Sequence, residues 1–251
     1  MRYAVLSDIH ANLPALHAVL DHVHREKIDR ILCLGDILGY GASPQECLDL
    51  IEKENALVIC GNHEAGCVGR LDLGWFNHAG RTALEWTRDR LGFVELNTLR
   101  RLLLSDIEGP FTLVHASLRH PEKFTYITDI ARATDCLAVC RTPVCLVGHT
   151  HAPLLVEYDP RRRELGRVMR DESIRDVRIS LDDNSTLRTL INPGSVGQPR
   201  DDDPRASFAI IDTSLATASV IRVEYDIASA QRSIREAGLP AILADRLSMG
   251  R

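Results

Sequence analysis

The sequence lacks the long apolar stretch that a transmembrane helix requires. No apolar run approaches the roughly 18 residues that would span a bilayer. The amino-terminal stretch MRYAVLSDIH contains an apolar run too short for a secretion signal. We therefore expect a cytoplasmic protein that has no membrane partner.

The sequence also lacks the features of a disulfide framework or a thiolate metal site. It contains seven cysteines, an odd number, and no Cys-x-x-Cys pair. Most of them lie inside apolar runs such as RILCLG and PVCLVG, which is typical of small buried core residues. Cys136 and Cys140 are one helical turn apart, and we favour packing over metal binding there as well.

An excess of basic charge is absent too. The formal net charge is −5, whereas a general nucleic-acid binder needs a basic surface for phosphates. We therefore expect no nucleic-acid partner. The sequence is 45% hydrophobic and 26% charged, as in ordinary globular proteins, with no internal repeat and no obvious linker. These observations favour one domain over residues 1–251.

Short apolar runs alternate with helical patterns as far as Pro153. Leu16, Val19, Leu20 and Val23 lie on one helical face, and Ser43-Pro-Gln-Glu46 is typical of a capped helix start. Two more helices are predicted over 77–104, with Leu96, Leu99, Leu102 and Leu103 as their buried stripe, and another over 128–140. Five strands are predicted at residues 3–7, 30–35, 56–61, 111–116 and 143–148. This alternation indicates βαβ units and a sheet covered by helices.

The pattern changes after Pro153. Several runs alternate apolar and polar residues with period two, which is typical of antiparallel hairpins. A closing helix is predicted to start at Asp226, with Ile227, Ala230 and Ile234 on one side, and to stop before Gly238 and Pro240. We expect a second, β-rich sheet and this helix to come from residues 154–251.

Polar residues with metal-ligating side chains follow each of the five early strands. Because the carboxyl ends of strands form the ligand-binding edge of α/β sheets, these residues are expected to converge. Five of the ten histidines are among them. The residues in question are Asp8, His10, Asp36, Asn62, His63, Glu64, His115, His149 and His151.

The donor set consists of carboxylates, imidazoles and one amide, without thiolates. Nitrogen and oxygen ligands suit manganese, which we favour, and also iron, zinc, cobalt or nickel. Even seven of these nine residues are too many for one catalytic ion but enough for two ions about 3.5–4 Å apart. The spacing of His149 and His151 alone leaves open whether they bind one ion or two.

The motifs DIH (8–10), GDILGYG (35–41), GNHE (61–64), HAS (115–117) and GHTH (148–151) resemble those of calcineurin-like metallophosphoesterases. The segment INPGSVGQPR (191–200) resembles the closing segment of the small bacterial YfcE-like and diadenosine-tetraphosphatase-like phosphodiesterases. The resemblance implies a four-layer α-β-β-α sandwich, with two mixed central sheets flanked by helices.

The resemblance also implies roles for individual residues. Asp8, His10, Asp36 and His151 would hold one ion. Asp36 would bridge to a second ion, which Asn62, His115 and His149 would complete. His63 would not bind metal but would act on the substrate phosphate, so His63 and Asp36 are the predicted catalytic residues.

The activity that the resemblance implies is hydrolysis of a phosphoester, with a diester preferred. Hydroxide formed at the two ions would attack phosphorus, and His63 would stabilise the transition state or protonate the leaving group. The substrate would be a small phosphoester or a nucleotide, and the protein is compatible with a homodimer. Two alternatives remain: a nuclease with the same ions, and a non-catalytic scaffold, a use of this fold known from a retromer subunit.

Some polar residues near these motifs have no assigned role. Glu64 stands where aspartate is commoner, and its longer side chain leaves open whether it orients His63. Arg119, Phe124 and Tyr126 lie in a loop suited to holding a base or a phosphate, although ordinary packing is favoured for the aromatic residues. Arg200 is expected either to contact phosphate or to pair with the acidic run 201–203.

Overall fold

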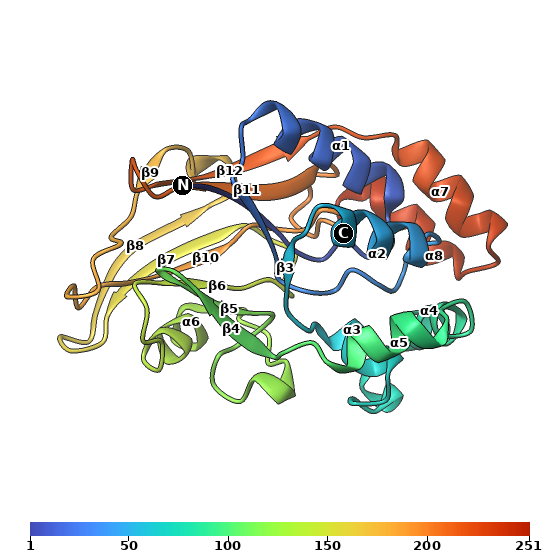
Figure 1. Ribbon diagram of the computed structural model, residues 1–251, viewed down its shortest axis with the longest axis horizontal. Coiled ribbons are helices and arrows are strands. Elements are labelled where there is room, and N and C mark those ends of the chain that lie inside the picture. Colours follow the sequence, from blue (N-terminus) through green and yellow to red (C-terminus); the bar gives the residue numbers. More distant parts are fainter.

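Two six-stranded sheets pack face to face in the computed structural model, which describes residues 1–251 except for the side chain of Glu172 (Figure 1). The first sheet has the order β3-β2-β1-β11-β12-β9, and the second has the order β4-β5-β6-β10-β7-β8. Both sheets are mixed, because β1 pairs parallel to β2 and antiparallel to β11, and β10 pairs parallel to β6 and antiparallel to β7. The strands are β1 (Arg2–Leu6), β2 (Arg30–Cys33), β3 (Leu57–Val58), β4 (Ser105–Glu108), β5 (Phe111–Val114), β6 (Val144–Leu146), β7 (Leu154–Asp159), β8 (Glu164–Arg170), β9 (Val177–Arg178), β10 (Arg188–Asn192), β11 (Ala206–Asp212) and β12 (Thr217–Val223).

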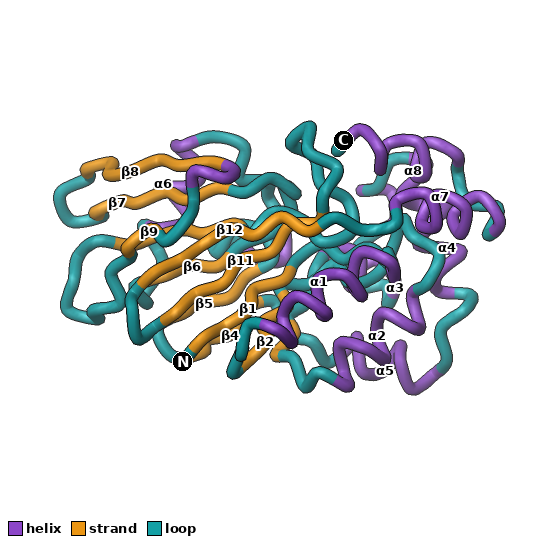
Figure 2. The backbone as a smooth tube through the Cα atoms, turned by 90° about the horizontal axis from the view of Figure 1, so that it is seen from above, coloured by secondary structure: helices purple, strands orange, loops and turns teal.

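Helices cover the outer faces of both sheets, which confirms the predicted four-layer α/β fold (Figure 1). Helix α1 packs on the first sheet, and α6 packs on β7 and β10 of the second. The other helices gather beyond one end of the strands (Figure 2). The α-helices are α1 (Leu13–Arg25), α2 (Pro44–Lys53), α3 (Asn62–Cys67), α4 (His78–Arg88), α5 (Phe93–Arg100), α6 (Ile130–Leu137), α7 (Ile227–Glu236) and α8 (Ala241–Asp245). Short 3-10 helices occur at η1 (Leu73–Trp75), η2 (Pro121–Lys123), η3 (Asp171–Ser173) and η4 (Arg246–Met249).

Helix α1 begins where its sequence provides a cap. The side chain of Asn12 accepts a hydrogen bond from the backbone N–H of Ala15 (3.2 Å), and Pro14 occupies the first turn. The predicted apolar face, which includes Leu16 and Val19, is buried against the first sheet. This packing fixes the loop between β1 and α1, which carries two of the candidate ligands.

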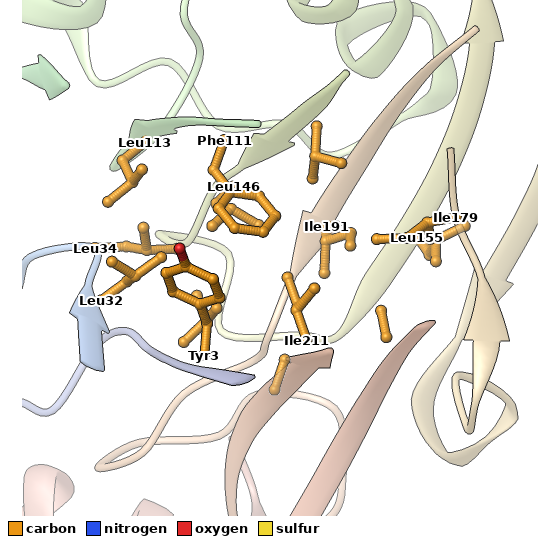
Figure 3. Packing of buried hydrophobic residues seen from close by; sticks show 14 of the residues in the cluster. Tyr3, Leu32, Leu34, Phe111, Leu113, Leu146, Leu155, Ile179, Ile191 and Ile211 are labelled. Atoms are coloured by element: carbon orange, nitrogen blue, oxygen red, sulfur yellow. The ribbon is translucent and has the colours of Figure 1, made fainter. Parts of the chain in front are cut away.

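The space between the sheets is filled by apolar side chains from both (Figure 3). Tyr3 of β1 meets Phe111 of β5 edge to face, with ring centroids 5.0 Å apart. Because helices cover the other face, the inner strands are buried on both sides, which explains their continuous apolar runs. The rigid core holds the carboxyl ends of β1, β2, β5 and β6 in fixed positions.

One prediction about the sheets is wrong. Residues 154–251 do not form a second sheet of their own, because each sheet combines strands from both parts of the chain. Strand β10 lies between β6 and β7, and β11 pairs with β1. An apolar strand pattern specifies burial but not the partner strand, so the sequence could not reveal this exchange.

Smaller predictions also differ from the structure. Leu103 is 57% exposed and does not belong to the buried stripe, since α5 ends at Arg100. Helix α2 begins at Pro44 as predicted, but Ser43 makes no capping hydrogen bond through its side chain. The backbone N–H of Ser43 instead donates to the carbonyl of Ala11 (3.1 Å), which leaves Glu46 without the donor that a capping box needs.

All seven cysteines are buried free thiols, as expected. Across the residues that the structure describes, no helix is both long enough and apolar enough to cross a membrane.

Candidate metal centre

The structure brings the predicted metal ligands together at the carboxyl ends of the strands. Each of them is buried, with at most 8% of its surface exposed. His63 is buried in the same place. The predicted ligands are Asp8 and His10 after β1, Asp36 after β2, Asn62 at the start of α3, His115 after β5, and His149 and His151 after β6.

The backbone at this edge is unusual. Five of the seven predicted ligands adopt left-handed conformations with φ between 50° and 67°, which residues other than glycine rarely do. Backbone hydrogen bonds hold the loops in this shape, including one from the N–H of His10 to the carbonyl of Asp36 (2.9 Å). Strain of this kind is typical of functional sites, where the surrounding structure enforces it.

Asp8, His10 and His151 form a first group of converging donors. The Nε2 atoms of His10 and His151 are 3.2 Å apart. Asp8 Oδ1 lies 3.3 Å from His151 Nε2 and 3.9 Å from His10 Nε2, and it has no hydrogen-bond partner of its own. Ligand atoms bonded to one ion at about 2.1 Å lie roughly 3 Å apart, so this group fits an ion.

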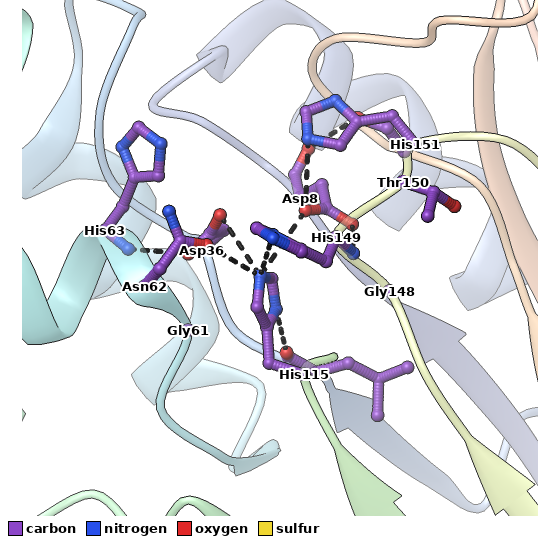
Figure 4. Close-up of polar contacts among 12 residues, drawn as sticks. Asp8, Asp36, Gly61, Asn62, His63, His115, Gly148, His149, Thr150 and His151 are labelled. Atoms are coloured by element: carbon purple, nitrogen blue, oxygen red, sulfur yellow. Dashed lines mark hydrogen bonds and ion pairs between the residues drawn. The ribbon is translucent and has the colours of Figure 1, made fainter. Parts of the chain in front are cut away.

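Asn62, His115 and His149 form a second group with Asp36 (Figure 4). His115 Nε2 lies 3.1 Å from both Asn62 Oδ1 and His149 Nδ1, and 3.3 Å from Asp36 Oδ2. The same Asp36 Oδ2 is 3.8 Å from His10 Nε2 in the first group. Asp36 therefore lies between the two groups, where a shared ligand would have to be.

Backbone carbonyls determine which ring nitrogens face the centre. The Nδ1 atoms of His10, His115 and His151 lie 2.9, 2.7 and 2.6 Å from the carbonyl oxygens of Leu38, Leu34 and Gln198. A carbonyl only accepts hydrogen bonds, so each Nδ1 carries a proton, and each ring directs its Nε2 toward the centre, where the neutral form offers a lone pair. No sequence pattern reports backbone groups of this kind, and the prediction missed them.

The pKa values follow from burial and from the proximity of opposite charges. Burial alone would raise the pKa of Asp8 and Asp36, but His151 and His115 respectively outweigh it and hold both values far below the usual range. Burial would lower the pKa of His115, yet the charge of Asp36 raises it to about 9. Burial lowers the pKa of His149 to about 3. In the absence of metal, His115 is therefore positively charged near pH 7 and balances part of the carboxylate charge.

His63 lies at the side of the two groups. Its backbone N–H donates to Asp36 Oδ1 (2.8 Å), and its ring contacts the rings of His10, Tyr40 and Phe76 at centroid distances of 4.7, 4.5 and 5.1 Å. The ring fits only because residue 39 is glycine, since a Cβ there would lie 1.9 Å from His63 Nδ1. Burial lowers the pKa of His63 to about 4, so its ring is neutral near pH 7.

Glu64 has a role that the sequence did not indicate. Its carboxylate accepts hydrogen bonds from the backbone N–H groups of Asp36 (2.7 Å), Leu38 (3.1 Å) and Gly61 (2.9 Å). It therefore ties the loop after β2 to the start of α3 instead of orienting the ring of His63. Burial and the charge of Asp36 raise the pKa of Glu64 to about 7.

The segment after β10 supports the centre from the other side. Asn192 Nδ2 donates to the carbonyl of Gly148 (2.8 Å), and Ser195 Oγ donates to the carbonyl of Asp8 (2.7 Å). Gln198 provides the carbonyl that holds His151. This segment therefore holds the backbone of Asp8 and Gly148 and the ring of His151 in place, and it contributes none of the predicted metal ligands itself.

Of the loop residues singled out in the sequence, Tyr126 reaches the centre. Its ring stacks on His149 with a centroid distance of 3.7 Å and an interplanar angle of 27°. Phe124 is buried, as the packing interpretation predicted, while Arg119 is exposed. Tyr40 was overlooked, although it lies inside the GDILGYG motif and its ring is 4.6 Å from that of His10.

A family model for the calcineurin-like phosphoesterase superfamily domain matches residues 1–215. The chain belongs to this superfamily. It is 38% identical to MJ0912, an uncharacterised protein of Methanocaldococcus jannaschii, over 99% of this chain and 98% of that one.

Solved structures agree with this membership. A metallophosphoesterase from Sphaerobacter thermophilus is 41% identical, covers both chains fully and superimposes with a TM-score of 0.85. The protein PH1004 from Pyrococcus horikoshii shares the fold, with 21% identity, a TM-score of 0.78, and coverage of 100% of this chain and 98% of its own. The chain is therefore a metallophosphoesterase, a metal-dependent phosphoric ester hydrolase with two mixed sheets and a buried Asp/His cluster.

Proposed function

We propose that this metallophosphoesterase holds two metal ions and hydrolyses phosphodiesters of small molecules or nucleotides. The observation that carries the proposal is the pair of Nε2 atoms of His10 and His151, 3.2 Å apart. Both rings donate Nδ1–H to carbonyls, so two lone pairs face each other in a buried site. Such an arrangement is repulsive unless a cation lies beside both nitrogens.

The ligand sets follow from the two groups of donors. Asp8, His10, Asp36 and His151 would hold one ion, and Asp36, Asn62, His115 and His149 would hold the other. Two cations, once bound, supply charge neutralisation for the phosphoryl oxygens and activate a water molecule near neutral pH. Nitrogen and oxygen donors of this kind bind manganese, iron, zinc, cobalt and nickel, and manganese is our first choice among them.

His63 would act on the substrate and not on the metal. It lies beside the ligands but outside the two sets, and its ring is neutral because burial lowers its pKa to about 4. A neutral imidazole donates a hydrogen bond from its protonated nitrogen, which stabilises charge that develops on phosphoryl or leaving-group oxygens.

Hydrolysis assays after metal removal and reloading test the proposal. Bis-p-nitrophenyl phosphate should be hydrolysed faster than p-nitrophenyl phosphate, most rapidly with Mn²⁺. Preference for the diester is proposed from the resemblance of residues 191–200 to the small phosphodiesterases. Absence of turnover of either ester with Mn²⁺, Fe²⁺, Zn²⁺, Co²⁺ and Ni²⁺ would contradict the proposed activity.

A further inference from the structure

His149 differs from the other predicted histidine ligands in the way its ring is held. The rings of His10, His115 and His151 each donate Nδ1–H to a backbone carbonyl. His149 instead turns its Nδ1 atom toward the centre, 3.1 Å from His115 Nε2 (Figure 4). Its Nε2 atom is buried and has no hydrogen-bond partner in the part of the chain that the structure describes. No acceptor behind the ring of His149 therefore fixes its orientation.

The backbone of His149 is held firmly, so only its ring remains to be oriented. The backbone N–H donates to Asp8 Oδ2 (3.0 Å). Arg200 does not support the ring, because its guanidinium donates to Gln198 Oε1 (2.7 and 3.3 Å). Arg200 also forms no ion pair with the acidic run 201–203, although such a pair was one of the two expectations. A histidine binds metal well only when its ring is held at the right angle, so another contact has to hold this ring.

The ring of Tyr126 packs on the ring of His149. The two rings are close to parallel, with a centroid distance of 3.7 Å and an interplanar angle of 27°. The ring of His115 meets the same imidazole edge to face, at a centroid distance of 4.9 Å. Stacked aromatic rings attract each other, and rotation of His149 about its Cβ–Cγ bond would break the stacking. The contact with Tyr126 therefore restricts the rotation that no carbonyl restricts.

Buried residues on both sides of Tyr126 hold it in place. Phe124 is 4% exposed and packs with residues of α3 and of the turn after β5. Ile127 is 5% exposed and packs with residues of β5 and α6. Tyr126 itself is 43% exposed, whereas the His149 beneath it is 4% exposed. The loop is therefore anchored in the core at two points and presents the ring of Tyr126 as a cover on His149.

We infer that Tyr126 is a positioning residue, which orients the ring of His149 toward the second metal ion. The inference rests on the proposed function, because that ion belongs to the proposed two-metal centre. The face of the aromatic ring carries this role and the hydroxyl does not, so phenylalanine should replace tyrosine without loss. The first group of donors does not include His149, and its affinity for metal should not depend on Tyr126.

Titration of the metal-free protein with Mn²⁺ tests this role independently of turnover. Calorimetry measures the affinity for each ion, and electron paramagnetic resonance distinguishes isolated Mn²⁺ from an exchange-coupled pair. Loss of a group that orients a histidine ligand weakens metal affinity about tenfold or more, so Tyr126→Leu should weaken the binding of one ion by about that factor. With Mn²⁺ below saturation, this variant should hold more isolated ions and fewer coupled pairs than the unmodified protein. The other ion should bind with unchanged affinity, which also shows that the variant is folded.

Two further variants separate the stacking from other effects. Tyr126→Phe keeps the ring, removes the hydroxyl and should bind both ions as the unmodified protein does. Phe93→Leu removes an aromatic ring that is 79% exposed at the start of α5, and it should also leave both affinities unchanged.

Three results would overturn the role of Tyr126: unchanged affinities in Tyr126→Leu, equal weakening of both ions in that variant, or an equally large loss in Tyr126→Phe. Absence of turnover in the unmodified protein, together with the selective loss of one ion in Tyr126→Leu, would reject only the proposed activity and would support the role of Tyr126.

Discussion

The absence of a Cβ atom at Gly39 allows the ring of His63 to pack close to the loop after β2. Gly39 has φ +83°, and the hydrogen in place of its side chain leaves room for the imidazole of His63. Gly69 has a similar φ of +77°, but a Cβ there would meet nothing within 4 Å. An alanine would therefore be similarly strained at both positions, and the two glycines differ in their relation to the site.

Substitution of Gly39 by alanine should displace the ring of His63 while the metal ligands stay in place. Since general acid–base contributions are about a hundredfold or more, turnover of bis-p-nitrophenyl phosphate should fall by about that factor. Gly69→Ala introduces the same strain without the contact, and its turnover should stay near that of the unmodified protein. Equal turnover in the two variants would show that the position of His63 does not matter.

Substitution of Asp36 should affect both metal content and turnover, whereas substitution of His63 should affect turnover alone. Asp36→Ala takes away the oxygen between the two ligand groups, so both metal content and turnover should be lost. His63→Ala should lower turnover about a hundredfold and leave metal content near normal. Elemental analysis and kinetics on the same samples measure both properties. Equal metal loss in the two variants would contradict the assigned division of roles.

At the scale of elements, a single carboxylate joins β2 to α3. Glu64 accepts three backbone hydrogen bonds, and its truncation would leave three buried N–H groups without a partner. An unsatisfied buried donor costs about 1–3 kcal/mol, so Glu64→Ala should lower the free energy of unfolding by about 3 kcal/mol or more. Urea denaturation of the metal-free protein measures the change.

Glu46→Ala provides the matched control on another helix. Glu46 lies in the first turn of α2, is exposed, and makes no capping contact, so its truncation should change stability by no more than about 0.5 kcal/mol. Similar losses in both variants would mean that the three hydrogen bonds of Glu64 contribute little.

The elements also show which part of the structure could be predicted from the sequence. The five strands and the clustering of the donor residues at their ends were predictable, because buried strands have continuous apolar runs and their carboxyl ends share an edge. Strand β4 was missed because its residues, Ser105–Glu108, are mostly polar at a sheet edge. The insertion of β10 beside β6 and the carbonyl partners of the histidines depend on tertiary contacts, which one sequence does not encode in a local pattern.

At the scale of the whole molecule, charge balance couples metal binding to pH. Without metal, burial favours a neutral His115, but the charge of Asp36 outweighs this effect and raises the pKa to about 9. The ring of His115 therefore carries a second proton and a positive charge near pH 7. His63 and His149, with pKa values of about 4 and about 3, are neutral at this pH. Metal binding must therefore release about one proton, which comes from His115, because the other histidines are already neutral.

The apparent metal affinity should rise about tenfold per pH unit between pH 6.5 and 8, and level off above the pKa of His115. The same proton contributes to the stability of the metal-free protein, since a pKa that is higher in the folded than in the unfolded state stabilises the folded state at low pH. That contribution should disappear as the pH rises through about 9. Calorimetry in buffers of different ionisation enthalpy counts the released protons, and release of none at pH 7 would contradict this charge balance.

Anomalous diffraction from crystals of the Mn²⁺-loaded protein tests the two-metal centre most directly. The arrangement of donors predicts two peaks per chain, about 3.5–4 Å apart, with Asp36 bonded to both. The first should also contact Asp8, His10 and His151, and the second Asn62, His115 and His149. A single peak, or two peaks that do not share Asp36, would contradict the account.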